Sequence, residues 1–405
     1  MKTVCIVGTL DTKGKETYYL KEVLERHGLA SFVMDVGAFA TDYTPDYSNT
    51  ELLQAIGEDI AEIRDGGRSV ATETLARAMR EVLPTLYEEG RFQGVIALGG
   101  SGGTAIATAG MQQLPVGVPK LMISTMASGN TTPYVGTSDI MMLPSIVDVA
   151  GLNRISRAIF NNACAAMAGM LAFDAEEEED DKPLVAASMF GLTTPAVTRA
   201  MEVLEAQGYE VLVFHATGTG GKTMESLVEQ GFFAGVLDLT TTEWCDELFG
   251  GVLHAGPHRL EAAALNGVPQ VVSLGALDMV NFGPFDTVPA RYEGRNFYKH
   301  NPTVTLMRTN AEENRLLGKK IAEKLNMATR ETVLLMPLQG LSGIDIAGGP
   351  FEGQQENAVL FETLRTELKN ELVRIVEVDQ HINDAAFAEQ AAETLMQLMK
   401  ERNDE

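Results

Sequence analysis

The chain has 405 residues, of which 45% are hydrophobic and 21% charged, so it is long enough to bury the cores of two domains. Its 56 acidic and 31 basic side chains give a formal net charge of −25, which repels polyanions and anionic membranes. This charge argues against nucleic-acid and membrane partners. The three cysteines are far apart and form no CxxC pair, which predicts no metal site and favours a cytoplasmic protein.

Apolar runs alternate with amphipathic segments along the whole chain. In the first half, strands are predicted at residues 3–7, 31–35, 94–98 and 120–124. In the second half, they are predicted at 184–189, 210–215, 235–239, 270–274, 304–307, 332–336 and 372–376, and a final helix at 384–400. Continuous Val/Ile/Leu strands separated by helices predict an α/β fold with a mostly parallel sheet in each half.

A run of like charges ending in proline, EEEEDDKP, separates the two halves. We therefore expect an N-terminal nucleotide-binding α/β domain at 1–175, an acidic linker at 176–182 and a C-terminal α/β domain for a substrate or partner at 183–405.

The two halves echo each other in order. Residues 2–37 and 182–217 both read strand, turn, helix, glycine, strand, and their helices end on EVLERHG and EVLEAQG. Farther on, FQGVIAL is echoed by FAGVLDL, and GVPKLMIS by GVPQVVSL. Three matches in register order predict two duplicated, Rossmann-like domains in tandem.

Three loops rich in glycine, serine and threonine follow strands of the first half, namely GTLDTKGKE, GGSGGT and STMASGNTT. In parallel sheets, such loops bring backbone N–H groups and helix N-termini close to anions. We expect the N–H groups of Gly99 to Gly103 to bind phosphate oxygens, helped by Thr104, with Lys13 adding a positive charge. Asp11 is a candidate ligand for Mg²⁺ or a sugar hydroxyl, or alternatively a helix N-cap.

The second half contains a competing pattern. HATGTGGKT, at 215–223, fits a relaxed phosphate loop with Ala216 in place of the first glycine, and Asp238 would then hold the metal. The loop follows the second strand of its domain rather than the first, which weakens this interpretation.

Histidine and arginine gather downstream of that loop. Candidate catalytic side chains are His254, His258, Arg291 and His300, the last two in a long aperiodic segment at 275–302 that we place at an inter-domain cleft. His254 and His258 have the spacing of a helical metal pair, but Gly256 and Pro257 lie between them, so no metal site is predicted.

Eight motifs along the chain carry a family resemblance: GTLDTKGKE, GGSGGT, GNTTPYVGTSDI, HATGTGGK, DLTTTE, GALDMVNFGP, HNPTVTLMRT and DQHIND. Together they resemble the family of ATP-binding proteins related to the N-terminal inhibitory domain of the tomato mosaic virus resistance protein, which has uncharacterised bacterial members. The resemblance implies two Rossmann-like subdomains, ATP bound by the first, and a homodimer. The nucleotide-binding residues that it implies are Gly8, Thr9, Asp11, Thr12, Lys13, Gly99, Gly100, Ser101, Gly102, Gly103, Thr104, Ser124, Ser128, Gly129 and Asn130.

The sequence thus predicts an ATP-binding protein, with Mg²⁺ as a candidate companion ion and a second site in the inter-domain cleft. The alternative is an ATP-dependent enzyme that acts on a small metabolite through the His/Arg cluster. An NAD-dependent dehydrogenase is disfavoured because the first turn lacks GxGxxG.

Overall fold

The computed structural model describes residues 1–173 and 182–403. The chain divides into two compact units, Met1–Glu177 and Glu178–Glu405, each with its own sheet. Of the predicted acidic linker at 176–182, only Lys182 lies among the described residues.

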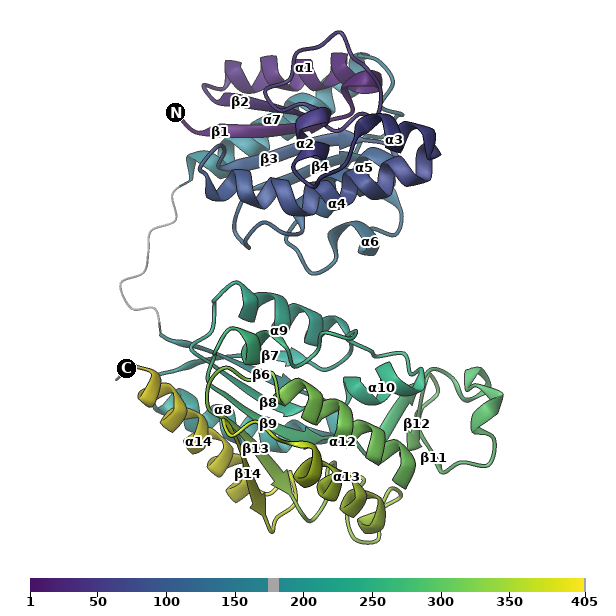
Figure 1. Cartoon of the computed structure of the whole chain (residues 1–405), viewed down its shortest axis with the longest axis vertical. Coiled ribbons are helices and arrows are strands. Elements are labelled where there is room, and N and C mark those ends of the chain that lie inside the picture. The colour runs from purple at the N-terminus through teal and green to yellow at the C-terminus, as the bar shows by residue number, and fades with distance from the viewer. Residues whose placement is uncertain (174–181, 404–405) are drawn as a thin grey trace. The chain divides into compact units, whose positions relative to one another are not determined.

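The N-terminal unit is built on one parallel sheet (Figure 1). Its strands are β1 (Thr3–Gly8), β2 (Ala30–Asp35), β3 (Gly94–Gly99), β4 (Lys120–Ser124) and β5 (Met141–Pro144), in the order β2-β1-β3-β4-β5. Its helices are α1 (Leu10–Arg26), α2 (Asn49–Gln54), α3 (Ile60–Asp65), α4 (Gly67–Glu88), α5 (Ser101–Met111), α6 (Thr132–Val135) and α7 (Arg154–Ala172).

Each face of this sheet is covered, which explains the continuous apolar strands. Helices α1 and α7 bury Leu20 and Phe160 on one face, and α4 and α5 bury Met79 and Ile106 on the other. The chain therefore passes to one face of the sheet after β1. After β3, the neighbouring strand, it passes to the opposite face. The carboxyl ends of β1 and β3 mark the point where the strand order reverses.

The C-terminal unit repeats this topology. Its parallel strands are β6 (Leu184–Met189), β7 (Glu210–His215), β8 (Gly235–Thr240), β9 (Gln270–Gly275), β13 (Thr332–Pro337) and β14 (Val373–Val378), in the order β14-β13-β9-β8-β6-β7. Its helices are α8 (Thr194–Ala206), α9 (Thr219–Glu229), α10 (Glu243–Phe249), α11 (Ala262–Leu265), α12 (Ala311–Leu325), α13 (Gln354–Glu367) and α14 (Ala385–Asn403).

Numbered from its own first strand, the second sheet begins with the same order as the first: second strand, first, third, fourth, fifth. The echoed segments 92–98 and 233–239 run into the third strand of each unit, and 117–124 and 267–274 into the fourth. The two units thus share one α/β topology, as expected for duplicated domains.

One predicted strand does not join the parallel sheet. The run at 304–307 lies in β12 (Val304–Arg308), which is the centre of a separate antiparallel sheet with β10 (Met279–Phe282) and β11 (Phe297–Asn301). The segment at 275–302, predicted as a long loop, therefore supplies two strands. Two 3₁₀ turns separate these short strands, so the segment shows no regular period.

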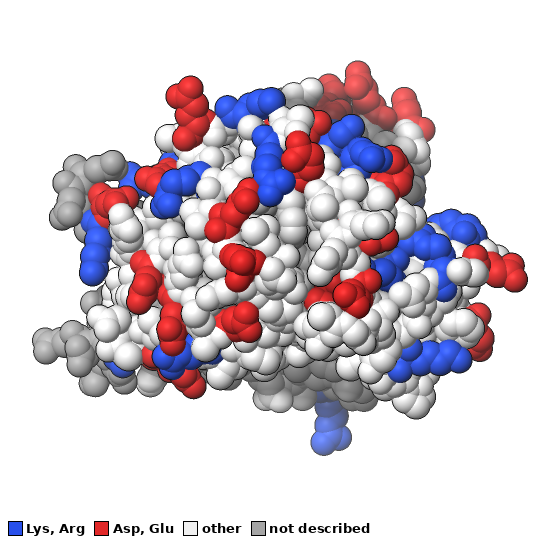
Figure 2. Space-filling model, turned by 90° about the horizontal axis from the view of Figure 1, so that it is seen from below, with Lys and Arg blue, Asp and Glu red and all other residues white. Residues whose placement is uncertain are grey.

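No helix in the described parts of the chain is long and apolar enough to cross a membrane. On the face shown in Figure 2, Lys and Arg side chains are interspersed with Asp and Glu and form no continuous basic surface.

Candidate functional site

The N-terminal unit has a cavity of about 680 Å³ at the carboxyl ends of β1 and β3. In open parallel sheets, ligands bind at this reversal of strand order. We call it the main cavity. It brings together all three predicted loops, through Thr9, Asp11, Thr12 and Lys13 after β1, Gly100, Ser101, Gly102 and Gly103 after β3, and Thr125 after β4.

The N-terminus of α5 opens into the main cavity without a side-chain cap. The N–H of Thr104 bonds to the Gly100 carbonyl at 2.9 Å, so the N–H groups of Ser101, Gly102 and Gly103 precede the helix's own hydrogen bonds. The helix dipole adds partial positive charge at the same place. This end of α5 is therefore prepared for an anion.

The glycines at this helix end are not required by packing. A Cβ on Gly102 would lie 3.8 Å from Thr72 Oγ1 and 3.9 Å from Arg68 Nη2, and one on Gly103 would have no neighbour closer than 3.7 Å. Neither residue has a positive φ. Glycine is a poor helix former, so its presence here is best explained by the close approach of a ligand.

Three cations line the main cavity, Lys13, Arg64 and Arg68. Within the described part of the chain, neither Lys13 nor Arg68 has a hydrogen-bond or ion-pair partner for its charged group. Arg64 donates to the Ala38 carbonyl and stacks on Phe39. Sequence analysis missed both arginines, although the break between α3 and α4 at Gly66 and Gly67 is flanked by them.

The main cavity is apolar at the end next to β2. Val36, Ala38 and Phe39 follow that strand, and Leu75 of α4 and Ile106 of α5 face the same space. The Phe39 side chain is 61% exposed, which is unusual for phenylalanine. The main cavity thus offers an apolar surface next to the N-terminus of α5.

Two carboxylates lie at the base of the first loop. Asp11 is in the first turn of α1, whose N-cap is Thr9, and it accepts a hydrogen bond from Phe39 N at 3.1 Å through Oδ2, while its buried Oδ1 has no partner among the described atoms. Asp35 accepts hydrogen bonds from Leu10 N and Gly37 N at 3.0 and 2.8 Å. Burial, and to a smaller extent the charge of Asp11, raises the pKa of Asp35 to about 6.

Other predicted site residues lie outside the main cavity. Thr104 and Ser124 are buried, and their hydroxyl groups bond to each other at 2.6 Å. Gly8 packs on Thr17, and Gly99 packs on Gly103. Gly129 and Asn130 are exposed beyond η1 (Thr125–Ser128), and Asn130 accepts a hydrogen bond from Thr132 N at 3.1 Å.

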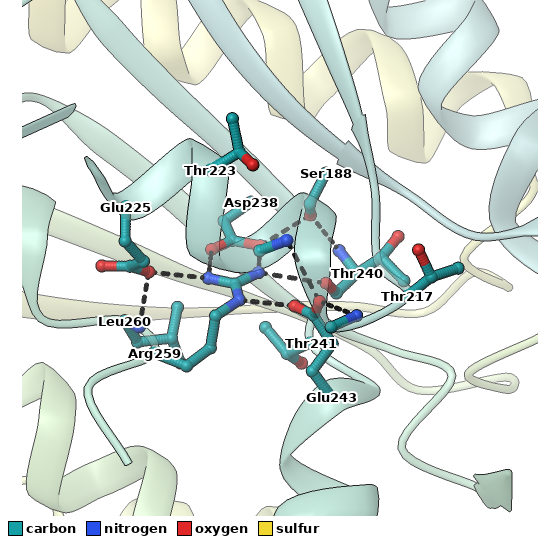
Figure 3. Close-up of polar contacts among 12 residues, drawn as sticks. Ser188, Thr217, Thr223, Glu225, Asp238, Thr240, Thr241, Glu243, Arg259 and Leu260 are labelled. Carbon is teal, nitrogen blue, oxygen red and sulfur yellow. Dashed lines mark hydrogen bonds and ion pairs between the residues drawn. The ribbon is translucent and has the colours of Figure 1, made fainter. Parts of the chain in front are cut away.

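In the C-terminal unit, a buried arginine fills the equivalent point of the sheet (Figure 3). Arg259 bonds to Asp238 at the end of β8 and to Glu243 at the start of α10, with Nη2–Oδ1 and Nε–Oε2 distances both of 2.7 Å. It also reaches Glu225 of α9 at 3.0 Å. Asp238 further accepts a hydrogen bond from Ser188 of β6.

The glycine-rich loop of this unit already has an anion. Glu243 Oε1 accepts hydrogen bonds from Gly218 N at 2.7 Å and Gly221 N at 3.1 Å, at the N-terminus of α9. A Cβ on Gly220 would lie 1.9 Å from the His215 carbonyl oxygen, so packing explains that glycine. The phosphate-loop pattern therefore closes around an internal carboxylate, and Asp238 is engaged by Arg259 rather than free for a metal.

The four candidate catalytic side chains have separate partners. His254 lies 3.3 Å from Glu247, His258 lies 2.8 Å from Glu261, and Arg291 donates to the Phe249 carbonyl. His300 contacts Tyr298. Within residues 1–173 and 182–403, no hydrogen bond, ion pair or ring contact joins any two of the four, and no group of three or more His, Cys, Asp or Glu side chains is arranged to hold a metal.

Both units of the chain match the domains of one protein family. Residues 2–176 match the N-terminal domain of the uncharacterised protein family UPF0261, and residues 182–399 match its C-terminal domain. A UPF0261 protein of Clostridium tetani is 49% identical over 98% of this chain and 99% of its own length. The tomato protein named ToMV resistance protein Tm-1(GCR237) is 38% identical over 98% of this chain but only 55% of its own length.

Among solved structures, a UDP-N-acetylglucosamine 2-epimerase from Rickettsia bellii is similar, with a TM-score of 0.24 and 9% identity over 67% of this chain and 78% of that chain. A likeness of this size assigns no function.

We predict that Asp35→Asn stabilises the protein in a pH-dependent manner. The folded state holds the Asp35 proton more tightly than the unfolded chain, so the carboxyl group's contribution to stability is present below pH 4 and is lost as the pH rises through about 6. The substitution should raise the free energy of unfolding by up to about 3 kcal/mol at pH 8 and by less than about 1 kcal/mol at pH 4. Urea unfolding at both pH values measures this; an equal gain at both would show that charge is not the cause.

We predict that Arg259→Met lowers the free energy of unfolding by about 3–5 kcal/mol, because three buried carboxyl groups lose their one shared cation. The matched control is Arg374→Met, which removes an exposed guanidinium that lies 3.4 Å from Glu331 and should cost less than about 1 kcal/mol. Urea unfolding of both variants checks this, and similar costs would contradict the role given to Arg259.

Proposed function

The chain belongs to the uncharacterised protein family UPF0261, and we propose that its N-terminal unit binds ATP in the main cavity. The observation that carries the proposal is the uncapped N-terminus of α5, with two glycines that packing does not require. Phosphate groups are the common ligands of such helix ends.

The other walls of the main cavity support a nucleotide rather than a free phosphate ion. Lys13 and Arg68 would balance the charge of a polyphosphate, and Arg68 Nη2 already lies near Gly102. The apolar end, with Phe39 and Leu75, offers a surface on which a base can stack. A volume of about 680 Å³ is in the usual range for a small-molecule site.

Mg²⁺ would fit as the companion of the polyphosphate. It is held mainly by phosphate oxygens and water, with one or two protein carboxylates. Asp11, whose Oδ1 has no partner among the described atoms, is the carboxylate of the main cavity that is best placed to take part. In this role the ion would neutralise phosphate charge next to the end of α5.

The proposal places ATP in the first unit and not on the second unit's glycine loop. There, Glu243 already occupies the N–H groups that a phosphate would use. The family resemblance noted from the motifs points to the same nucleotide and the same unit. The alternative of catalysis by the His/Arg cluster receives no support from contacts among the four side chains.

We predict that Gly102→Ala weakens ATP binding at least about tenfold without loss of stability. A Cβ at this position enters the main cavity, while alanine favours the helix by up to about 1 kcal/mol. The control is Gly169→Ala in α7, where a Cβ would meet nothing within 4 Å. Calorimetric titration with Mg·ATP and thermal unfolding test both variants; unchanged affinity in Gly102→Ala would contradict the proposed phosphate position.

We also predict that Lys13→Ala and Arg68→Ala each weaken ATP binding far more than Lys222→Ala, by about tenfold or more. Lys222 is an exposed residue of α9, on the loop that Glu243 already occupies. The same titration measures all three variants. Equal effects, or a larger effect of Lys222→Ala, would move the nucleotide to the second unit.

A further inference from the structure

A second cavity adjoins the main one. It has a volume of about 330 Å³ and is lined by Thr125, Ser128, Ser145, Ile146, Val147 and Asp148. We call it the side cavity. Thr125 and Asp148 line both cavities, so the two spaces are adjacent.

The order of the strands gives the combined site a direction. Along the carboxyl edge of the sheet, the apolar end follows β2, the phosphate site lies at β1 and β3, and the side cavity lies beyond β4 and β5. A nucleotide with its base at the β2 end and its phosphates at α5 would extend toward β4. Its terminal phosphate would then face the side cavity.

The lining of the side cavity is suited to a small polar molecule. Among the described residues, the hydroxyl groups of Thr125 and Ser128 have no hydrogen-bond partner, and Ser145 Oγ donates to the Val147 carbonyl at 2.7 Å. Free hydroxyl groups both donate and accept hydrogen bonds, as the hydroxyl groups of a ligand do. The side cavity therefore fits a small molecule that carries hydroxyl groups.

A strained turn presents Asp148 to both cavities. Val147 N donates to the Ser145 carbonyl at 2.7 Å, which closes a three-residue turn with Ile146 at its centre. Ile146 has a φ of 62° and is 74% exposed, although a β-branched residue is costly in this conformation. Such strain is kept where the surrounding structure holds a functional residue in position.

The carboxylate of Asp148 has no hydrogen-bond or ion-pair partner within residues 1–173 and 182–403. It lies where the terminal phosphate and an acceptor would meet. A carboxylate near a phosphate is unfavourable unless it serves a cation or accepts a proton. An acceptor hydroxyl group between the two supplies that proton.

We propose that the N-terminal unit transfers the terminal phosphoryl group of ATP to a hydroxyl group of a small polyhydroxylated acceptor in the side cavity, with Asp148 as general base. The acceptor oxygen forms a bond to the γ-phosphorus, the bond from that phosphorus to the β–γ bridging oxygen breaks, ADP leaves, and the hydroxyl proton goes to Asp148. This inference rests on the proposed ATP site.

The test uses the full chain with Mg²⁺, ATP labelled at the γ-phosphate, and glycerol as the probe acceptor. Formation of labelled glycerol phosphate, in excess of phosphate released to water, is expected. Calorimetric titration on the same preparation measures ATP binding. ATP binding without transfer to glycerol, with or without hydrolysis, overturns this inference alone, whereas the absence of binding overturns the proposed function as well.

Two variants separate chemistry from acceptor binding. Asp148→Asn should lower kcat by about 10²–10⁴-fold without weakening ATP binding, because the proton acceptor is lost and a negative charge next to the phosphates is removed. Ser128→Leu should raise the KM for glycerol at least about tenfold, because the leucine fills the side cavity.

The matched control is Asp65→Asn, an exposed carboxylate at the end of α3 with the same change of charge. It should keep the wild-type kcat and KM. Equal transfer rates for Asp148→Asn and the wild type would overturn the assignment of the base, and an unchanged KM in Ser128→Leu would overturn the acceptor position.

Discussion

The contact between the Glu243 carboxylate and the N–H groups of Gly218 and Gly221 illustrates a constraint that acts on both units. Parallel sheets place helix N-termini at one edge, and these ends carry unpaired donors and partial positive charge. In the second unit the chain supplies its own anion. In the first unit, α5 has no side-chain cap, and its donors face the main cavity.

The two units therefore share a topology but differ in what occupies the equivalent point of the sheet. Between β6 and β8, Arg259 and its carboxylate partners occupy the space, and their burial makes that point part of the core. Between β1 and β3, the corresponding space is open, and its cations lack acidic partners among the residues that the structure describes. The shared strand order is the one that duplicated domains would have, and the different side chains at the carboxyl ends of the strands account for the difference. The proposed division of labour, with a ligand in one unit and a structural ion network in the other, follows from it.

Much of the fold could be predicted because buried parallel strands leave a strong signal. The run at 120–124 and the strands at 184–189 and 210–215 have the observed bounds of β4, β6 and β7, since their continuous apolar residues are covered on both faces. The four-residue strands β5 and β10 were missed, because so few residues establish no period. The place of β12 in a separate antiparallel sheet also depends on long-range pairing that local pattern does not encode.

The candidate site was predictable only in part. Glycine-rich loops after strands identified the walls at Thr9–Lys13 and Gly100–Gly103, because backbone geometry and sequence are directly linked there. Arg68 was missed because its role depends on the packing of α4 against α5. Asp148 was assigned no role because a strained turn, not a motif, directs it. The opposite case is HATGTGGKT, whose sequence fits a phosphate loop. In the structure, Glu243 from another element already accepts a hydrogen bond from this loop. The local sequence predicts well where unpaired N–H donors lie. It does not predict which side chain from another element will accept their hydrogen bonds.

The most direct measurement of the central claim is a crystal structure of the full chain with Mg²⁺ and a non-hydrolysable ATP analogue. We expect the phosphates to accept hydrogen bonds from the N–H groups of Ser101, Gly102 and Gly103, with the base near Phe39 and with Glu243 still bonded to Gly218 and Gly221. Phosphates bound at the N-terminus of α9, with Glu243 displaced, would contradict it.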